Sequence, residues 1–372
     1  MNRQDILFYV WLSRSFPFGS IMPSKILKHY NGRILQFYEN LEAEIKNFKI
    51  TEKSLNKLLN KDLTDCEKIL NLSEKLNIKI VCFYDELFPE RLREIKSAPI
   101  VLYYMGNLKI TFSPCVGVVG TRNCSSNSFE TTKSIISQLV NYNITTISGC
   151  ARGVDSAVHS ETLKKGGNTI SVLGTPLESS YPYENKELKK LIVKNNGLLI
   201  SEYPPKTITS TWHFPIRNRI ISALSDCVIV VQSKEKSGTI VTAKKALEFN
   251  KSLFFVPPLK IFDNNCKTIK KCLENGAKML FEMQDILKIF ENLKYKPKIK
   301  EKTNVKLNNK INCLPETFKS LVEIIGKEKT LDEILKQTKF KACETLFMLT
   351  KLELLNILEK TKTGYRRCWV LW

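Results

Sequence analysis

Apolar residues in the first quarter of the chain recur at intervals of three and four, which is the spacing of one face of a helix. Leu55, Leu58, Leu59 and Leu63 are an example. We therefore predict a helical N-terminal domain over residues 1–90, for which the sequence gives no function.

The pattern changes from Cys115 onward, where six short apolar runs alternate with helix-length segments of mixed polarity. The runs are CVGVV, ITTIS, TISVLG, GLLISEY, CVIVVQS and SLFFVP. Runs that are apolar on both faces and alternate with helices are typical of a parallel sheet covered on both sides. The fold class is therefore α/β, and we predict a doubly wound, Rossmann-like parallel sheet as the core of a domain over residues 91–290.

The last part of the chain has a different texture. Residues 291–312 are rich in lysine and poor in apolar residues, so we expect a basic linker there. Residues 313–372 contain three segments with helical spacing, followed by a short segment that reads as a β wing, and Thr330 with Glu333 forms a capping box. This pattern predicts a winged-helix module, which could bind duplex DNA or protein.

Charge makes a polyanion the expected partner. The 372 residues include 58 Lys and Arg against 37 Asp and Glu, a formal net charge of +21. Such an excess favours nucleic acid over a membrane surface, although a basic surface that only maintains solubility remains an alternative.

Other features of the composition favour a cytoplasmic protein. No apolar run approaches the roughly 18 residues that a membrane span needs, and the run ILFYVWL lacks the cleavage site of a signal peptide. The eleven cysteines contain no closely spaced pair. We therefore expect reduced thiols, no metal site and no membrane association.

Candidate binding residues follow the predicted strands, because in a doubly wound sheet the ligand lies beyond the carboxyl ends of the strands. After the first strand, Gly120 permits a tight turn, Thr121 offers a hydroxyl and Arg122 stands near the start of a helix, which together predict an anion site. The spacing of Gly117 and Gly120 does not fit the dinucleotide fingerprint, so neither NAD nor FAD is expected.

The turn after the second strand also has the composition of a phosphate site. The residues expected to provide open backbone N–H groups or positive charge are Ser148, Gly149, Arg152 and Gly153. Asp155 and His159 are four positions apart and so share a helical face. They could act in acid–base catalysis, but a structural hydrogen bond that fixes the loop is the favoured interpretation.

Two further turns complete the set. Arg217, Asn218 and Arg219 are expected in the first turn of a helix, where a cation opposes the helix dipole unless an anion is nearby. Ser237, Gly238 and Thr239 begin the next helix, where they could cap it or hold a phosphate. Capping alone would explain any one turn, but four turns with four arginines at one sheet edge favour a phosphate ligand.

Six segments resemble, in order, the DNA processing protein A (DprA/Smf) family over about residues 88–280. They are FPERLREIKSAPIVLYYMGNL, VGVVGTR, SGCARGVDSAVH, LISEYPP, FPIRNRIISALS and SGTIVTAKKALE. The resemblance implies a core that binds single-stranded DNA, protects it from nucleases and assists loading of the RecA recombinase in natural transformation and recombination. It also implies a homodimer formed through the core, without catalytic residues or a cofactor.

The resemblance further implies that Arg122 and Phe214 bind the single strand, with Arg152, Arg217 and residues 237–239 lining the same pocket. The chain departs from the family pattern in two loops. Pro176 and Glu178 replace the usual glycine and aspartate after the third strand. Pro258 replaces a glycine, and DNNCKT stands where a Gly-x-Asn signature is usual. We expect these changes to alter the two loops and to leave the Arg122 pocket intact.

Two other classes of function are alternatives. The first is a nucleotide-binding enzyme like the nucleoside-monophosphate phosphoribohydrolases, but the segment SGTIVTAK lacks their double glycine and has no acidic residue before Glu248 to act as a base. The second is a transcription regulator with a winged helix on duplex DNA and a ligand-sensing core. Its recognition helix would carry only Lys341 and Lys351 as cations, a poor set for reading bases.

Overall fold

The structure is a computed structural model, and its described residues are 1–233, 237–258, 264–292, 314–325, 329–338, 340–354, 357–361 and 363–367. Contacts divide the chain into two compact units, Met1–Ile299 and Lys300–Trp372. Most of the predicted basic linker lies outside the described residues.

The first unit begins with the predicted helical region. Its helices are α1 (Arg3–Ser15), α2 (Met22–His29), α3 (Ile34–Glu39), α4 (Leu41–Glu44), α5 (Glu52–Leu59) and α6 (Thr64–Lys75). A capping box between Asn2 and Asp5 starts α1, and this helix buries Phe8, Val10 and Leu12 in the same cluster as the strands of the central sheet. The packing is therefore continuous across residue 90, where the sequence suggested a boundary.

The centre of this unit is a mixed, mostly parallel sheet. Its strands are β1 (Lys79–Cys82), β2 (Val101–Gly106), β3 (Cys115–Val119), β4 (Thr145–Ser148), β5 (Thr169–Leu173), β6 (Leu198–Ser201), β7 (Cys227–Val230), β8 (Ser252–Phe255) and β9 (Lys278–Met279). Their order is β1-β2-β6-β5-β4-β3-β7-β8-β9. All six apolar runs are confirmed as strands, and every residue of β3 to β7 is buried.

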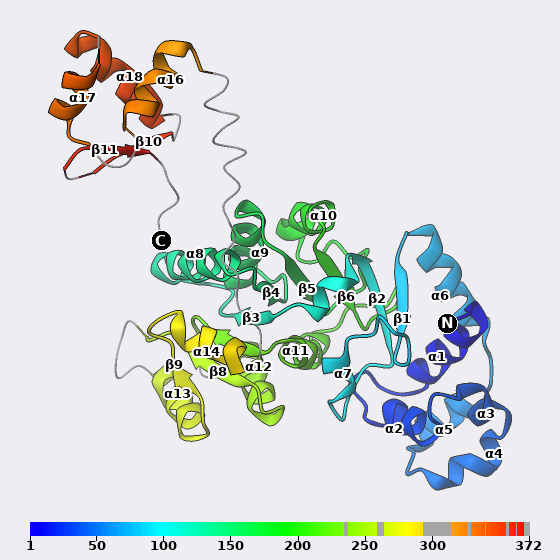
Figure 1. The fold of residues 1–372 in the computed structure, drawn as a ribbon. Helices are drawn as coiled ribbons and strands as arrows, with labels where there is room; N and C mark the ends of the chain where they lie inside the picture. The colour runs from blue at the N-terminus through cyan, green and yellow to red at the C-terminus, as the bar shows by residue number, and fades with distance from the viewer. Residues whose placement is uncertain are drawn as a thin grey trace. The chain divides into compact units, whose positions relative to one another are not determined.

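The parallel strands are wound in two directions from β3. Helices α8 (Ser126–Asn141), α9 (Val154–Lys164) and α10 (Lys186–Lys194) connect β3 to β6 along one face. Helices α11 (His213–Leu224) and α12 (Gly238–Glu248) lie on the other face and lead to β7 and β8 (Figure 1). The chain thus reverses its direction of winding between β3 and β7. The predicted doubly wound topology is therefore confirmed.

The two strands at one edge of the sheet, β1 and β2, were not expected from the sequence pattern. β2 pairs antiparallel with β6, and β1 pairs antiparallel with β2. The short helix α7 (Glu90–Arg93) lies between them in sequence, α13 (Asn264–Glu274) leads from β8 to β9, and α14 (Gln284–Asn292) follows β9.

The second unit contains the predicted helices followed by a hairpin. Its elements are α16 (Glu316–Ile325), α17 (Leu331–Gln337), α18 (Ala342–Leu354), β10 (Leu358–Lys360) and β11 (Tyr365–Arg367). The capping box of Thr330 and Glu333 is confirmed, and β10 pairs antiparallel with β11. This order is compatible with a winged helix, but that assignment remains a prediction. In the described part of the chain, no helix has the length and apolar character needed to cross a membrane.

Candidate nucleic-acid interface

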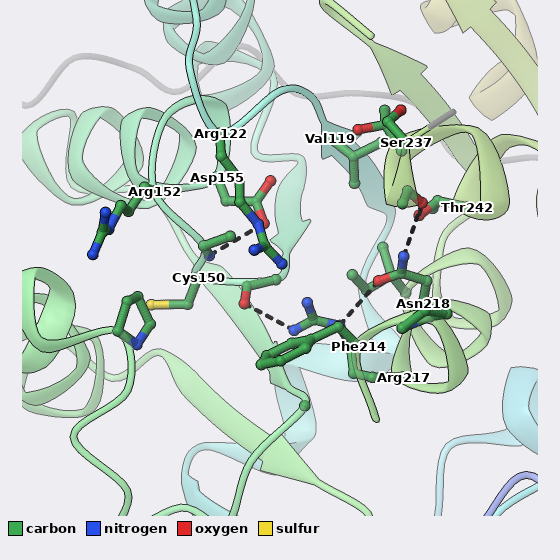
Figure 2. A pocket seen from close by; sticks show the side chains of 18 of the residues that line it. Val119, Arg122, Cys150, Arg152, Asp155, Phe214, Arg217, Asn218, Ser237 and Thr242 are labelled. Carbon is green, nitrogen blue, oxygen red and sulfur yellow. Dashed lines mark hydrogen bonds between the residues drawn. The ribbon is translucent and has the colours of Figure 1, made fainter. Parts of the chain in front are cut away.

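A cavity of about 630 Å³ opens at the carboxyl ends of the parallel strands. Its wall is formed by the turns that follow β3, β4 and β5, together with the first residues of α11 and α12 (Figure 2). Because β3 and β7 are the strands at which the winding reverses, the cavity lies at the topological switch point, where open α/β sheets bind their ligands.

Most of the predicted residues line this cavity. They are Gly120, Thr121, Arg122, Gly149, Arg152, Phe214, Arg217, Asn218, Ser237, Gly238 and Thr239. Ser148 does not line it, because its buried hydroxyl donates to the Val118 carbonyl at 2.8 Å inside the sheet. Gly153 lies behind the wall with φ of 76°, and a Cβ there would be 2.4 Å from the Thr121 carbonyl oxygen.

Arg219 is not in the cavity, and its predicted place in the first turn of a helix is wrong. Because α11 begins at His213, both Arg217 and Arg219 follow its first turn. Two residues apart on a helix means about 200° of rotation, so the two arginines point in opposite directions. The Arg219 guanidinium forms a buried ion pair with Glu202 at 2.7 Å and lines a different hollow beside Phe18.

Arg122 and Phe214 come together as the sequence predicted, although they are far apart in the chain. Arg122 is exposed in the turn after β3, and its guanidinium carbon lies 5.5 Å from the centre of the Phe214 ring. Phe214 is half-buried in the first turn of α11. The pair therefore places a cation and an accessible aromatic ring side by side at the cavity wall.

The start of α12 has unused hydrogen-bonding groups. Ser237 is the N-cap residue, but its side chain makes no capping hydrogen bond, and its buried Oγ has no partner in the described part of the chain. Gly238 is exposed. Thr239 donates its hydroxyl to the Gly120 carbonyl at 3.1 Å, which ties α12 to the turn after β3. Capping alone thus does not account for Ser237, and the helix N-terminus is placed to receive an anion.

Arg217 forms part of the cavity wall. Its Nη1 donates to the carbonyls of Gly149, at 2.8 Å, and Val172, while its Nε donates to Asn218 Oδ1 at 3.1 Å. A Cβ at Gly149 would lie 2.5 Å from the guanidinium, so this approach requires glycine. Arg217 therefore joins the turn after β4 and strand β5 to α11, and Figure 2 shows its bond to the turn after β4.

Asp155 and His159 do not contact each other as a catalytic pair would. Asp155 Oδ2 accepts a hydrogen bond from the Ala151 N–H at 3.2 Å, and burial raises its pKa against the opposing effect of Arg217. His159 is fully buried with Nδ1 at 2.7 Å from Thr169 Oγ1, and burial lowers its pKa to about 3. These contacts support the structural interpretation of both residues.

Arg152 lies at the rim of the cavity. Its exposed guanidinium is 2.7 Å from Glu184 and extends away from Phe214 (Figure 2). With both side chains more than half exposed, this ion pair is weak and can be exchanged for another anion at little cost.

Several lining residues were not identified from the sequence. Tyr181 and Pro182 come from the loop between β5 and α10, and Cys150 holds the turn after β4 in a left-handed conformation with φ of 56°. The pair YP was visible in the sequence, but no pattern indicated that this loop would reach the cavity. In the same loop, Glu178 accepts a hydrogen bond from the Lys206 N–H at 2.6 Å and so fixes the loop.

Comparison with known proteins places this geometry in a family. The family model for DNA recombination-mediator protein A matches residues 79–291. DNA processing protein DprA of Streptococcus pneumoniae is 39% identical over 207 residues, which cover 56% of this chain and 72% of the relative. The corresponding protein of Bacillus subtilis is 35% identical over 227 residues, with 61% and 75% covered.

Solved structures agree. The X-ray structure of S. pneumoniae DprA has a TM-score of 0.62 and 29% identity, and the match covers 76% of this chain and 97% of that one. DNA processing protein A of Helicobacter pylori, described for its single-stranded DNA binding mode, has a TM-score of 0.51 and 30% identity, with 59% and 98% covered. Because the family model matches more than half of its length and its cavity lies at the switch point, the chain belongs to the DNA recombination-mediator protein A (DprA/Smf) family.

Proposed function

We propose that this protein binds single-stranded DNA in the cavity at the switch point. The observation that carries the proposal is the Arg122 guanidinium 5.5 Å from the centre of the Phe214 ring at the wall of that cavity. A cation suits a phosphate and a half-exposed ring suits a base, and only a single strand offers unpaired bases that are free to stack.

The remaining cavity groups support a phosphate backbone as the ligand. Arg152 adds a second exposed cation, and the start of α12 provides N–H groups with the unpartnered Ser237 hydroxyl beside them. The net charge of +21 attracts any polyanion at longer range. The H. pylori relative, whose described property is single-stranded DNA binding, supports the same choice.

From membership in the family we further propose a role in natural transformation and recombination. The protein would act in the cytoplasm as a homodimer formed through the core, protecting single strands from nucleases and assisting the loading of RecA recombinase. No catalytic step or cofactor is part of this proposal.

The cavity gives little support to the phosphoribohydrolase alternative. Asp155 is the only carboxylate among its described lining residues, and it is buried and bound to the Ala151 N–H. A carboxylate that is already bound to the main chain of its own turn is poorly suited to act as the general base that activates water. For the regulator alternative, α18 carries Lys351 but also exposes Leu346 and Phe347, side chains unsuited to reading base edges.

The test combines an assay for protection of single-stranded DNA with an assay for hydrolysis of nucleotides. A labelled single strand is incubated with the protein and a single-strand exonuclease, and the same preparation is incubated with nucleoside monophosphates. We expect protection that rises with protein concentration and no released base. Unprotected DNA together with released base would replace this proposal with the enzyme alternative.

A further inference from the structure

Tyr181 is a second aromatic residue at the cavity. It comes from the loop between β5 and α10, and its side chain lines the cavity beside Phe214. The two ring centres are 5.5 Å apart and the ring planes are inclined at 44°. Tyr181 is 46% exposed, so its ring is accessible to a ligand in the cavity.

The main chain of Tyr181 is fixed by a buried lysine. Lys189 on α10 is 5% exposed, and its Nζ donates to the carbonyls of Tyr181 at 2.6 Å and Ser179 at 3.0 Å. Burying an ammonium group is costly unless its donors are satisfied, and here the acceptors are loop carbonyls. Burial of Lys189 is thus coupled to the conformation of the loop that presents Tyr181.

The far end of the same loop is also fixed. Asn185 Nδ2 donates to the carbonyls of Cys150 at 2.9 Å and Ala151 at 3.1 Å, which belong to the cavity turn after β4. The loop is therefore attached to α10 on one side and to the cavity on the other. An exposed aromatic ring held in this way loses little conformational freedom when a ligand binds.

We propose that Tyr181 is a second base-stacking residue and that Lys189 is its positioning residue. The inference deepens the proposed binding of single-stranded DNA and rests on it. Phe214 is packed against Gly174, where a Cβ would lie 2.8 Å from the ring, and it has Arg122 nearby. Because the Tyr181 ring is inclined to that of Phe214, the two rings offer differently oriented faces to neighbouring bases of one strand.

The first test compares two tyrosines of the same segment. Tyr183 is 76% exposed and does not line the cavity, so Tyr183→Ala is the matched control for Tyr181→Ala. Affinity for a labelled oligothymidine is measured at several salt concentrations. We expect Tyr181→Ala to weaken binding by roughly 5- to 150-fold with an unchanged salt slope, because stacking releases no counterions. Tyr181→Phe and Tyr183→Ala should bind oligothymidine with the affinity of the wild-type protein.

The second test addresses Lys189 with a double-mutant cycle. Lys189→Met removes the ammonium group but keeps a long apolar side chain. If Lys189 acts through Tyr181, its replacement should weaken binding when Tyr181 is present and have little further effect in Tyr181→Ala. Equal losses in both backgrounds, with melting temperatures preserved, would overturn the positioning role.

Two failures are distinguishable. If the unchanged protein binds oligothymidine and Tyr181→Ala binds equally well, the stacking role is wrong while the proposed function stands. If the unchanged protein binds no single strand, the function and the inference both fail. As a direct readout, an oligonucleotide carrying 5-iododeoxyuridine should photocross-link to the peptide containing Tyr181, and cross-links only elsewhere would contradict the proposal.

Discussion

Arg122 and Phe214 offer different chemistry to a single strand, so their contributions can be separated by salt. Arg122→Ala removes an exposed cation and should weaken binding to every single strand. We expect the slope of log affinity against log salt concentration to flatten by about 0.7, the value for one phosphate contact. The matched control is Arg33→Ala, which removes an exposed arginine outside the cavity and should leave the slope nearly unchanged. An unchanged slope in Arg122→Ala would exclude the phosphate contact.

Phe214→Ala should weaken binding without changing the salt slope, unlike Arg122→Ala. Loss of a stacked base costs about 1 to 3 kcal/mol of binding free energy and leaves the salt slope unchanged. Because Phe214 is half-buried beside Tyr181 and Gly174, we expect only a modest fall in melting temperature. Measuring the melting temperature together with the affinity separates the loss of stacking from the loss of folding. A variant that binds normally, or that binds poorly only because it is unfolded, would contradict the stacking role.

His159 predicts a pH dependence of stability. Its folded pKa of about 3 lies below the unfolded value of about 6.5, so the unfolded chain binds more protons between these values. Stability from this residue is fully present above pH 6.5 and is lost on acidification, by at most about 1.4 kcal/mol per pH unit.

Urea unfolding between pH 7 and pH 4.5 measures this effect. We expect the free energy of unfolding to fall less steeply on acidification in His159→Gln than in the unchanged protein. His29 is exposed, so His29→Gln is the matched control and should keep the original steepness. Identical curves for all three proteins would show that His159 is not the group responsible.

At the scale of elements, the parallel strands were predictable because both of their faces are buried. An unbroken apolar run such as Val116 to Val119 has few other structural interpretations once helices alternate with it. Strands β1 and β2 were not predicted, because β2 joins the sheet by pairing with β6 and β1 by pairing with β2, and local sequence encodes neither pairing.

Among the site residues too, those placed by local sequence were predictable and those placed by distant contacts were not. Turns that directly follow strands were predictable, since the carboxyl ends of parallel strands meet at one edge. Arg219 was misplaced because α11 begins at His213, so Arg217 and Arg219 both follow its first turn, and their spacing of two residues turns them in opposite directions. Tyr181 was missed because its loop is positioned by Lys189 and Asn185, through contacts that no local pattern reveals.

The start of α12 can be tested with Gly238. A Cβ at this position would meet only Asn218 Nδ2 at 3.7 Å, so alanine fits without strain. We expect Gly238→Ala to keep or slightly raise the melting temperature, because alanine is the better helix former. Single-strand affinity should fall, since the methyl group obstructs an anion approaching the helix N-terminus.

The comparison for this element is Gly120→Ala. There a Cβ would lie 2.5 Å from the Val154 side chain, so stability itself should fall. If Gly238→Ala keeps both its stability and its full affinity, the start of α12 does not contact the DNA backbone.

At the scale of the whole molecule, a net charge of +21 draws single-stranded and duplex DNA alike. Charge therefore supplies affinity without selectivity, and selectivity for single strands has to come from the cavity, where unpaired bases can reach Phe214. The described lining residues of the cavity all belong to the first unit, Met1–Ile299, so this selectivity is expected to be a property of that unit.

The most direct test of the central claim is competition between single-stranded and duplex DNA for the full-length protein. A labelled oligothymidine is bound at moderate salt and displaced by unlabelled single strand or by duplex of equal phosphate concentration. We expect the single strand to compete far more effectively, with affinity falling as salt rises and with the preference reduced in Phe214→Ala. Equal or better competition by duplex would contradict single-strand binding in the cavity and favour a duplex-binding role of the second unit.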